Sequence, residues 1–119
     1  LSHPAYLSSS FILRGSQPQA VILQHAPARR YLSDFPFAPI PTPASEIQLI
    51  ESFAPTRVIG LTINNEGMNE AQLTAAIALY EAELSIPVTD AISRPAANLV
   101  AMVVRAFPEL KGVRQPLVL

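Results

Sequence analysis

The stretch Val58-Ile59-Gly60-Leu61-Thr62-Ile63 decides the fold class of this chain, and it runs directly into Asn64-Asn65. Short apolar runs rich in β-branched residues are typical of strands buried on both faces of a parallel sheet. Two further runs share this form and also end in polar residues: Ala20-Val21-Ile22-Leu23 before Gln24-His25, and Ile86-Pro87-Val88-Thr89 before Asp90. The sequence therefore predicts three parallel strands, at about residues 19–25, 58–63 and 87–92.

Helical patterns separate the predicted strands. Between residues 70 and 84, apolar side chains recur at steps of four, three and four, which places them on one helix face, and Asn69 precedes them as a cap. Further helices are predicted over residues 4–14, 45–53 and 96–107, and the last is apolar nearly all round, which predicts burial on more than one side. This alternation predicts a βαβ succession, and so an α/β fold with a parallel sheet flanked by helices.

One long segment, residues 26–43, holds five of the twelve prolines. Because proline fixes φ and lacks a backbone donor, neither a helix nor a central strand is expected there. The segment also holds three aromatic residues, so we expect a proline-rich loop that packs down as an ordered flap. The tail, residues 111–119, has an apolar end, and we expect it to dock on another part of the protein.

The length of 119 residues accommodates one domain, and about half of the residues are apolar, which is enough for a hydrophobic core. Three strands make a thin sheet for an α/β domain, and Leu1 opens directly on a predicted helix start. We therefore expect residues 1–119 to be a portion of a larger domain, with an upstream part of the same protein as its partner. A complete small domain is the alternative.

The composition argues against several classes of function. Charged residues make up 14% of the chain, the net charge is −1, and the basic residues are scattered, which argues against nucleic-acid binding. No stretch approaches the roughly 20 apolar residues of a membrane span. There is no cysteine, and the two histidines lie far apart, so no metal site is predicted. We expect a cytoplasmic protein that binds a small molecule, and exposed sheet edges would favour a homo-oligomer.

Two residues at predicted strand ends are candidates for acid–base chemistry. In an open parallel sheet the ligand crevice lies outside the carboxyl ends of the strands, where His25 and Asp90 are placed. His25 could act as a general base or donate to an anion, and Asp90 could accept a proton, orient His25 or hold an arginine. The structural alternatives are a histidine bonded to a loop carbonyl and an aspartate in a salt bridge.

Four further residues are candidates for binding. Arg29 and Arg30 suit a carboxylate or phosphate, with one expected to face the crevice and the other solvent. Asn64 offers a donor and an acceptor for an amide or a purine edge, whereas Asn65 is assigned mainly to the turn. His3 stands at a predicted helix start, where anions are favoured, and it is otherwise a capping neighbour.

Four motifs occur in an order that suggests a family. The chain resembles the carboxyl-terminal part of the D-glutamate N-acetyltransferase (DgcN-like) family, long catalogued as a domain of unknown function. Members of that family resemble P-loop nucleotide-binding proteins, with the phosphate loop upstream of the matched region. The chain has Ala28 where members usually have glycine, and a left-handed backbone there would be strained. The matching stretches are Ser2-His3-Pro4-Ala5-Tyr6, Gln24-His25-Ala26-Pro27-Ala28-Arg29, residues 58–64 and Pro87-Val88-Thr89-Asp90.

The resemblance implies an acyltransferase that moves acetyl from acetyl-CoA, as co-substrate, to the amine of D-glutamate or a similar amino acid. It implies that His25, supported by Asp90, takes the ammonium proton, and that Arg29 or Arg30 binds a carboxylate or a coenzyme phosphate. Asn64 would hold an amide or the adenine ring. Two alternatives stay open: an ATP- and Mg-dependent ligase or kinase-like enzyme, and a non-enzymatic nucleotide-binding or assembly module.

Overall fold

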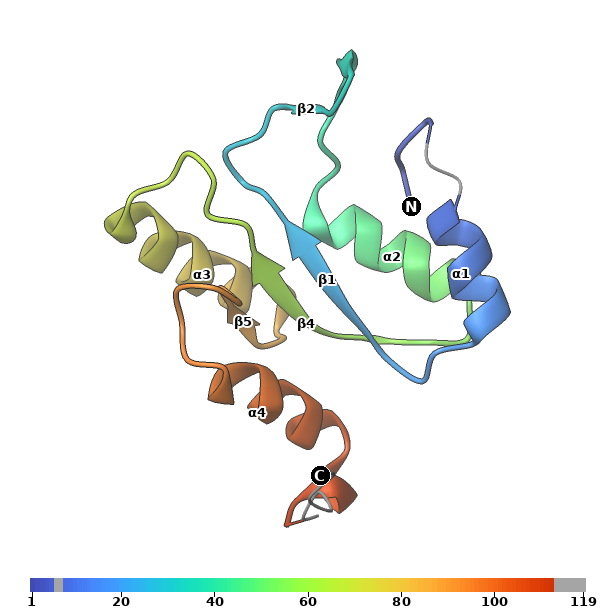
Figure 1. Cartoon of the computed structure of the whole chain (residues 1–119), viewed down its shortest axis with the longest axis vertical. Coiled ribbons are helices and arrows are strands. Elements are labelled where there is room, and N and C mark those ends of the chain that lie inside the picture. The colour runs from blue at the N-terminus through green and yellow to red at the C-terminus, as the bar shows by residue number, and fades with distance from the viewer. Residues whose placement is uncertain (6–7, 113–119) are drawn as a thin grey trace, which may run out of the picture.

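Three parallel strands form the centre of the computed structural model, which describes residues 1–5 and 8–112. They are β1 (Val21–His25), β4 (Val58–Ile63) and β5 (Val88–Thr89), in the order β1-β4-β5 (Figure 1). Both pairings are parallel. The predicted α/β fold with a parallel sheet flanked by helices is therefore confirmed. Most of the predicted tail, residues 113–119, lies outside the described residues, so its docking stays a prediction.

Four helices surround the sheet in the described part of the chain. They are α1 (Ser8–Ser16), α2 (Pro43–Phe53), α3 (Glu70–Leu84) and α4 (Ala97–Ala106), and a short 3₁₀ turn, η1 (Pro108–Leu110), follows α4. The predicted cap of α3 is present, because the Asn69 side chain accepts from the Gln72 backbone while the Gln72 side chain accepts from the Asn69 backbone. None of these helices has the length and apolar character needed to cross a membrane.

The core lies on the side of the sheet that faces α2 and α3. Leu61, Ile63 and Val88 pack there with Leu73 of α3, and Leu61 and Leu73 are almost fully buried. A second cluster joins Leu13 of α1, Ile50 and Ala54 near the end of α2, and Val58. Leu23 of β1 contacts both clusters, so the two helical layers share one continuous apolar base.

The opposite side of the sheet is covered by α4 alone among the described elements. Gly60 and Leu61 point to opposite sides because successive strand residues alternate, and Gly60 faces Met102 of α4. Met102 is 1% exposed, but Val100 of the same helix is 62% exposed. The prediction that this helix is buried on more than one side is therefore wrong, because no described element packs against its outer face.

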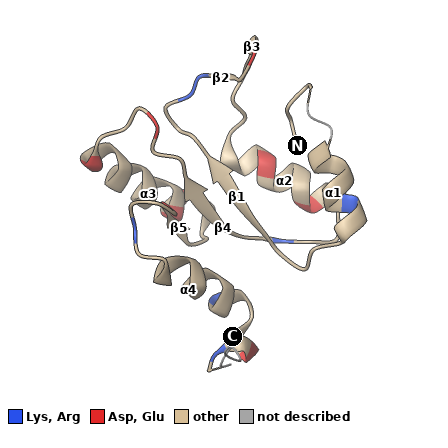
Figure 2. Ribbon diagram, viewed as in Figure 1, with Lys and Arg blue, Asp and Glu red and all other residues tan. Residues whose placement is uncertain are grey.

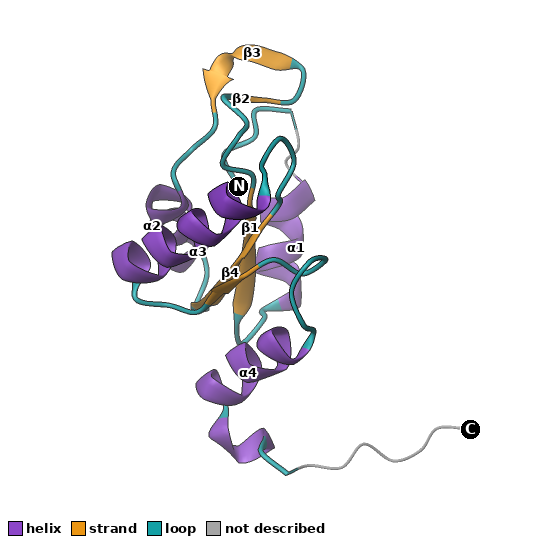
Figure 3. Ribbon diagram, turned by 90° about the vertical axis from the view of Figure 1, so that its left-hand side faces the viewer, coloured by secondary structure: helices purple, strands orange, loops and turns teal. Residues whose placement is uncertain are grey.

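The proline-rich segment contains a hairpin that the sequence did not predict. Strands β2 (Tyr31–Leu32) and β3 (Phe35–Pro39) pair antiparallel and project from the body of the molecule (Figure 3). Proline is tolerated because a two-stranded ribbon leaves one edge of each strand without ladder partners. Phe35 packs edge-on against Phe37, which is itself 77% exposed. The expected flap is thus a hairpin, and the segment ends where α2 begins at Pro43.

The first helix begins later than predicted. Residues 4 and 5 form a bend, and α1 begins at Ser8 rather than Pro4. A proline close to a chain start suits a first helical turn, but it suits a bend equally well, so the residue type alone does not fix the helix start. The segment that carries His3 is therefore not a helix start, which removes the basis for expecting an anion there.

Replacing Gly60 should show how closely α4 approaches the sheet. A Cβ built on Gly60 would lie 2.5 Å from the sulfur atom of Met102, so Gly60→Ala must displace a buried side chain. We expect the free energy of unfolding in urea to fall by about 1–3 kcal/mol. Gly15→Ala is the matched control, because nothing lies within 4 Å of the added carbon. Equal stability of the two variants would contradict this packing.

Candidate functional site

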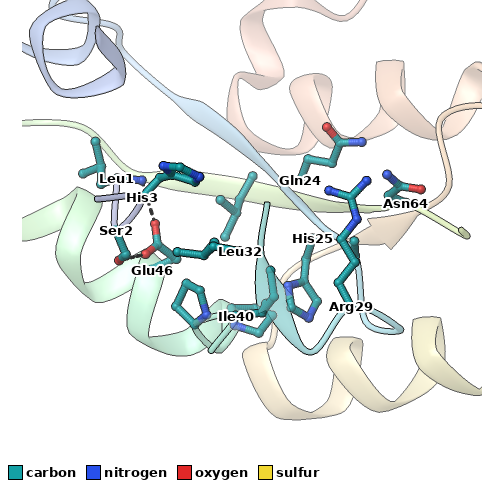
Figure 4. Close-up of a pocket in the computed structure, with 14 residues that line it drawn as sticks. Leu1, Ser2, His3, Gln24, His25, Arg29, Leu32, Ile40, Glu46 and Asn64 are labelled. Carbon is teal, nitrogen blue, oxygen red and sulfur yellow. Dashed lines mark hydrogen bonds and ion pairs between the residues drawn. The ribbon is translucent and has the colours of Figure 1, made fainter. Parts of the chain in front are cut away.

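The carboxyl ends of β1 and β4 meet at one edge of the sheet. His25 pairs with Ile63 in the parallel register, and the backbone nitrogen of Asn64 donates to the His25 carbonyl at 2.7 Å. A cavity of about 270 Å³, here called the rim cavity, opens at this edge (Figure 4). It is lined by Leu1, Ser2, His3, Leu23, Gln24, His25, Ala26, Arg29, Leu32, Ile40, Pro41, Pro43, Glu46 and Asn64.

His25 is half-buried between β1 and α3. Its ring meets Tyr80 edge-on, with centroids 5.5 Å apart, and burial lowers the pKa of His25 below its ordinary value of 6.5. Neither ring nitrogen has a hydrogen-bond partner among residues 1–5 and 8–112. The alternative of a bond to a loop carbonyl is therefore not realised here. An imidazole that is neutral at pH 7 can accept a proton from a ligand.

Arg29 and two amide side chains gather at one end of the rim cavity. Figure 4 shows Gln24, Arg29 and Asn64 pointing toward one another. Arg29 Nε and Nη2 both donate to one oxygen of Glu66, at 2.9 and 2.5 Å. Both partners are substantially exposed, and exposed pairs contribute little stability, so a ligand anion can replace Glu66. Gln24 was missed because its side chain alternates with His25 along the strand, and amides on exposed strand positions carry no distinctive pattern.

The two asparagines after β4 share the work differently from the prediction. Asn64 Oδ1 accepts from the Glu66 backbone at 3.0 Å, and the Asn65 carbonyl accepts from Met68 at 3.0 Å. The side chain of Asn64 therefore already serves the turn that was assigned mainly to Asn65. Its amide nitrogen remains as a donor toward the cavity, so the proposed binding role narrows to donation.

The loop after β1 accommodates alanine where the resembling family has glycine. Ala28 is not among the described residues with positive φ, whereas Gly67 opposite it has φ of 72°. A Cβ on Gly67 would lie 3.4 Å from the Ala28 side chain. The left-handed turn is thus made at Gly67, and the strain expected at Ala28 is absent.

Glu46 is a buried carboxylate that the sequence did not single out. It lies in the first turn of α2, is 7% exposed and accepts from the Ser2 hydroxyl and from the Leu1 nitrogen, the latter at 2.9 Å. These bonds hold residues 1 and 2 against α2, so Glu46 shapes one wall of the rim cavity. Its partners lie more than forty positions away in sequence, and no local pattern predicts such a contact.

His3 lines the same cavity and links the amino-terminal segment to the hairpin. Its Nδ1 accepts from the Ala5 backbone at 3.2 Å, and its Nε2 lies 3.2 Å from the Ser33 carbonyl. The ring also packs edge-on against Phe35, with centroids 5.2 Å apart. Both ring nitrogens are engaged, so His3 positions the hairpin over the cavity rather than presenting a free donor.

Asp90 stands at the same edge of the sheet but lies outside the rim cavity. Since β4 separates β1 from β5, the ends of the outer strands are about 10 Å apart, too far for a hydrogen bond between Asp90 and His25. Asp90 Oδ1 instead accepts from the Ile92 and Ser93 backbones at 2.7 and 3.0 Å. Its Oδ2 is buried without a partner in the described part of the chain. The expected orientation of His25 by Asp90 is therefore not realised.

The surroundings of Asp90 favour its charged form. Burial by itself raises the pKa of Asp90, but the Ile92 and Ser93 backbone donors, the Ser93 hydroxyl and the charge of Arg94 outweigh it, so the pKa is lowered. Arg94 is paired with Glu70 at 2.8 Å, which fixes it beside the loop. The 2% exposed carboxylate thus fastens the turn after β5.

Arg30 does not line the rim cavity. It lines an adjoining cavity of about 280 Å³, here called the loop cavity, which lies between residues 27–30, residues 40–43 and α3. His25 and Arg29 line both cavities. The expected division between the two arginines is thus changed, because each faces a cavity and only Arg29 reaches the rim.

The charges of the described residues are scattered over the elements rather than gathered in a stripe of one sign (Figure 2). Within residues 1–5 and 8–112, no group of three or more histidine, aspartate or glutamate side chains is arranged to hold a metal ion. The chemistry that the described site supports therefore rests on His25, the arginines and the amides.

Asp90→Asn should destabilise the protein in a pH-dependent manner. The folded-state pKa lies below the ordinary value of 3.8, so the carboxylate stabilises the fold above that value and stops doing so as the pH falls through the folded-state pKa. We expect the variant to lose about 1–2 kcal/mol of unfolding free energy at pH 7. The difference from wild type should shrink below about pH 4.

Urea unfolding of both proteins between pH 7 and pH 3 measures this difference. Asp34→Asn, at an exposed turn of the hairpin, controls for the loss of one carboxylate. A difference that stays constant across this pH range would contradict the assigned role of Asp90.

Comparisons with known proteins agree with this fold. The family described as "Domain of unknown function (DUF1611_C) P-loop domain" matches residues 1–100. The crystal structure of a DUF1611 family protein from Anabaena variabilis is similar with a TM-score of 0.81 and 29% identity, covering 88% of this chain and 33% of that one. The chain thus spans about a third of the length of that solved protein. No curated protein matches. The chain belongs to the DUF1611 family, of which it is the carboxyl-terminal P-loop-like domain.

Proposed function

We propose that this chain is part of an enzyme that transfers acetyl from acetyl-CoA to the amine of D-glutamate or a similar amino acid. The observation that carries the proposal is His25, whose unengaged imidazole, with a lowered pKa, opens onto the rim cavity. The resemblance of the motifs around His25, Asn64 and Asp90 to the D-glutamate N-acetyltransferase family supplies the substrates. The remaining part of the protein would supply the phosphate loop that these 119 residues lack.

The reaction needs a base at this position. The substrate ammonium gives one proton to His25, and the amine nitrogen then attacks the thioester carbonyl carbon. A nitrogen–carbon bond forms, the carbon–sulfur bond breaks, and the departing thiolate takes the second proton released by the nitrogen. His25 returns its proton to solvent, so the step ends with an amide, the free thiol and an unchanged enzyme.

The rim cavity offers groups suited to the acyl donor. Gln24 and Asn64 present amides that can hydrogen-bond to the amides or the adenine of coenzyme A, and Arg29 can leave the exposed Glu66 for a phosphate. A cavity of about 270 Å³ holds the reactive end of such a donor, whereas the bulk of the coenzyme would extend beyond it.

The family match favours a second candidate. A P-loop domain is the usual setting for ATP-dependent chemistry, so an ATP- and Mg-dependent ligase or kinase-like enzyme is the alternative. Coenzyme A release in the presence of D-glutamate, measured beside ATP hydrolysis in the same full-length protein, separates the two candidates. ATP hydrolysis that depends on the amino acid, without coenzyme A release, would replace the acyltransferase proposal by the alternative.

His25→Gln in the full-length protein should lower turnover by about 10²–10⁴-fold, because glutamine cannot accept the ammonium proton. Substrate binding should change little, since the amides and arginines remain. Initial rates of coenzyme A release measure turnover, and calorimetry of substrate binding is the control for a correctly folded site. Turnover within a few-fold of wild type would remove His25 from the mechanism.

The pH profile of kcat/KM gives an independent check. Because burial lowers the pKa of His25 below 6.5, the neutral base predominates at pH 7 and is lost as the pH falls through that pKa. We expect kcat/KM to fall on the acid side of pH 6.5 and to show no such step between pH 7 and 8. The residual activity of His25→Gln should lack the acid limb, and its persistence there would assign the limb to another group.

A further inference from the structure

The loop cavity is a second hollow that shares a wall with the rim cavity. The shared wall consists of His25 and Arg29 together with Ile40, Pro41 and Pro43. Three prolines border the loop cavity outside or within this wall, and each fixes φ, so the wall has little backbone freedom. His25 is therefore reached from two sides by groups that do not have to pass one another.

Two opposite charges face the loop cavity without partners. The side chains of Arg30 and Glu83 both line it, and neither makes a hydrogen bond or ion pair within residues 1–5 and 8–112. Tyr80 lies between Glu83 and His25 along this wall, since Glu83 acts electrostatically on Tyr80 and Tyr80 packs against His25. The cavity thus presents a cation at one part, an anion at another and a base beside the anion.

Arg29 adds a second cation to this arrangement. Its pair with Glu66 is exposed on both sides and is exchanged at little cost. The groups facing the loop cavity then comprise two guanidinium ions and one carboxylate, which complement a ligand with two carboxylates and one ammonium. Among small molecules with that charge pattern are the acidic α-amino acids.

The size of the loop cavity agrees with a small ligand. Its volume of about 280 Å³ lies just below the range of roughly 300–1,000 Å³ that encloses drug-sized ligands. A coenzyme with a nucleotide and a long arm would not fit, whereas an amino acid with a short side chain would. The apolar part of the lining, which includes Leu79 and Ile40, suits the methylene groups of such a side chain.

We infer that the loop cavity is the acceptor subsite of the proposed transferase and that Glu83 and Arg30 select an acidic α-amino acid there. Glu83 pairs with the ammonium group and holds it toward His25, and Arg30 pairs with a carboxylate. The acyl donor reaches His25 from the rim cavity. The inference rests on the proposed function for the role of His25, but the ligand class follows from the charges of the cavity.

Equilibrium binding to the full-length protein, without acyl donor, tests the subsite. The probes are D-glutamate and glutarate, which differ by the ammonium group. Arg30→Gln should weaken the binding of both probes by about tenfold or more, because a charge-assisted contact is lost. Glu83→Gln should weaken D-glutamate by a similar factor and leave glutarate unchanged or bound more tightly.

The matched controls are Arg105→Gln and Glu109→Gln, which remove the same charges from residues that do not line the loop cavity. Neither control should change the affinity for either probe by more than about twofold. The inference is overturned if Arg30→Gln or Glu83→Gln behaves like its control, if Glu83→Gln weakens both probes alike, or if wild type binds neither probe.

The outcome for the subsite is separable from that for the proposed function. Charge-dependent binding of D-glutamate without coenzyme A release would keep the subsite and discard acetyl transfer. Coenzyme A release whose KM for D-glutamate is unchanged in Arg30→Gln and Glu83→Gln would keep acetyl transfer and discard the subsite. Where transfer occurs, both variants should raise the KM for D-glutamate and leave the KM for acetyl-CoA within about twofold.

Discussion

The parallel pairing of β1 with β4 is the constraint on which the rest of the structure depends. It ends with the Asn64 nitrogen on the His25 carbonyl at 2.7 Å, so the last residue of one strand and the first residue beyond the other share one edge. The Leu61 side of β4 builds the core with α3, and the Gly60 side admits Met102 of α4. A shift of this register by one residue would reverse both faces and remove His25 from the cavity.

The segment after β1 turns this edge into two small cavities. The chain leaves His25, forms the β2–β3 hairpin and returns at Pro41 and Pro43 to begin α2, so prolines border the space on the return side. Because φ is fixed at each proline, the wall between the cavities keeps its shape without a large core behind it. His25 sits in this wall, half-buried against Tyr80, where burial keeps the imidazole neutral at physiological pH.

Charge in this molecule acts mainly over short distances. Asp90, Glu46 and Glu66 each hold a loop or a segment through specific donors, and only Arg30 and Glu83 line the loop cavity with no such commitment. Committed charges stabilise the frame, since removing one partner would strand the other, whereas uncommitted ones are available for a ligand. This difference separates the residues that shape the site from those that can recognise a substrate.

The sequence by itself determined the three strands, the cap at Asn69 and the edge at which His25 and Asn64 meet, because apolar periodicity and capping are local properties. It did not reveal that Asp90 lies one strand too far from His25, that Glu46 joins residues 1 and 2, or that α4 buries a single side. These facts depend on strand order and on contacts across more than forty residues. Only the tertiary structure decided them, because such contacts are set by how whole elements pack and leave no mark on the residues nearby.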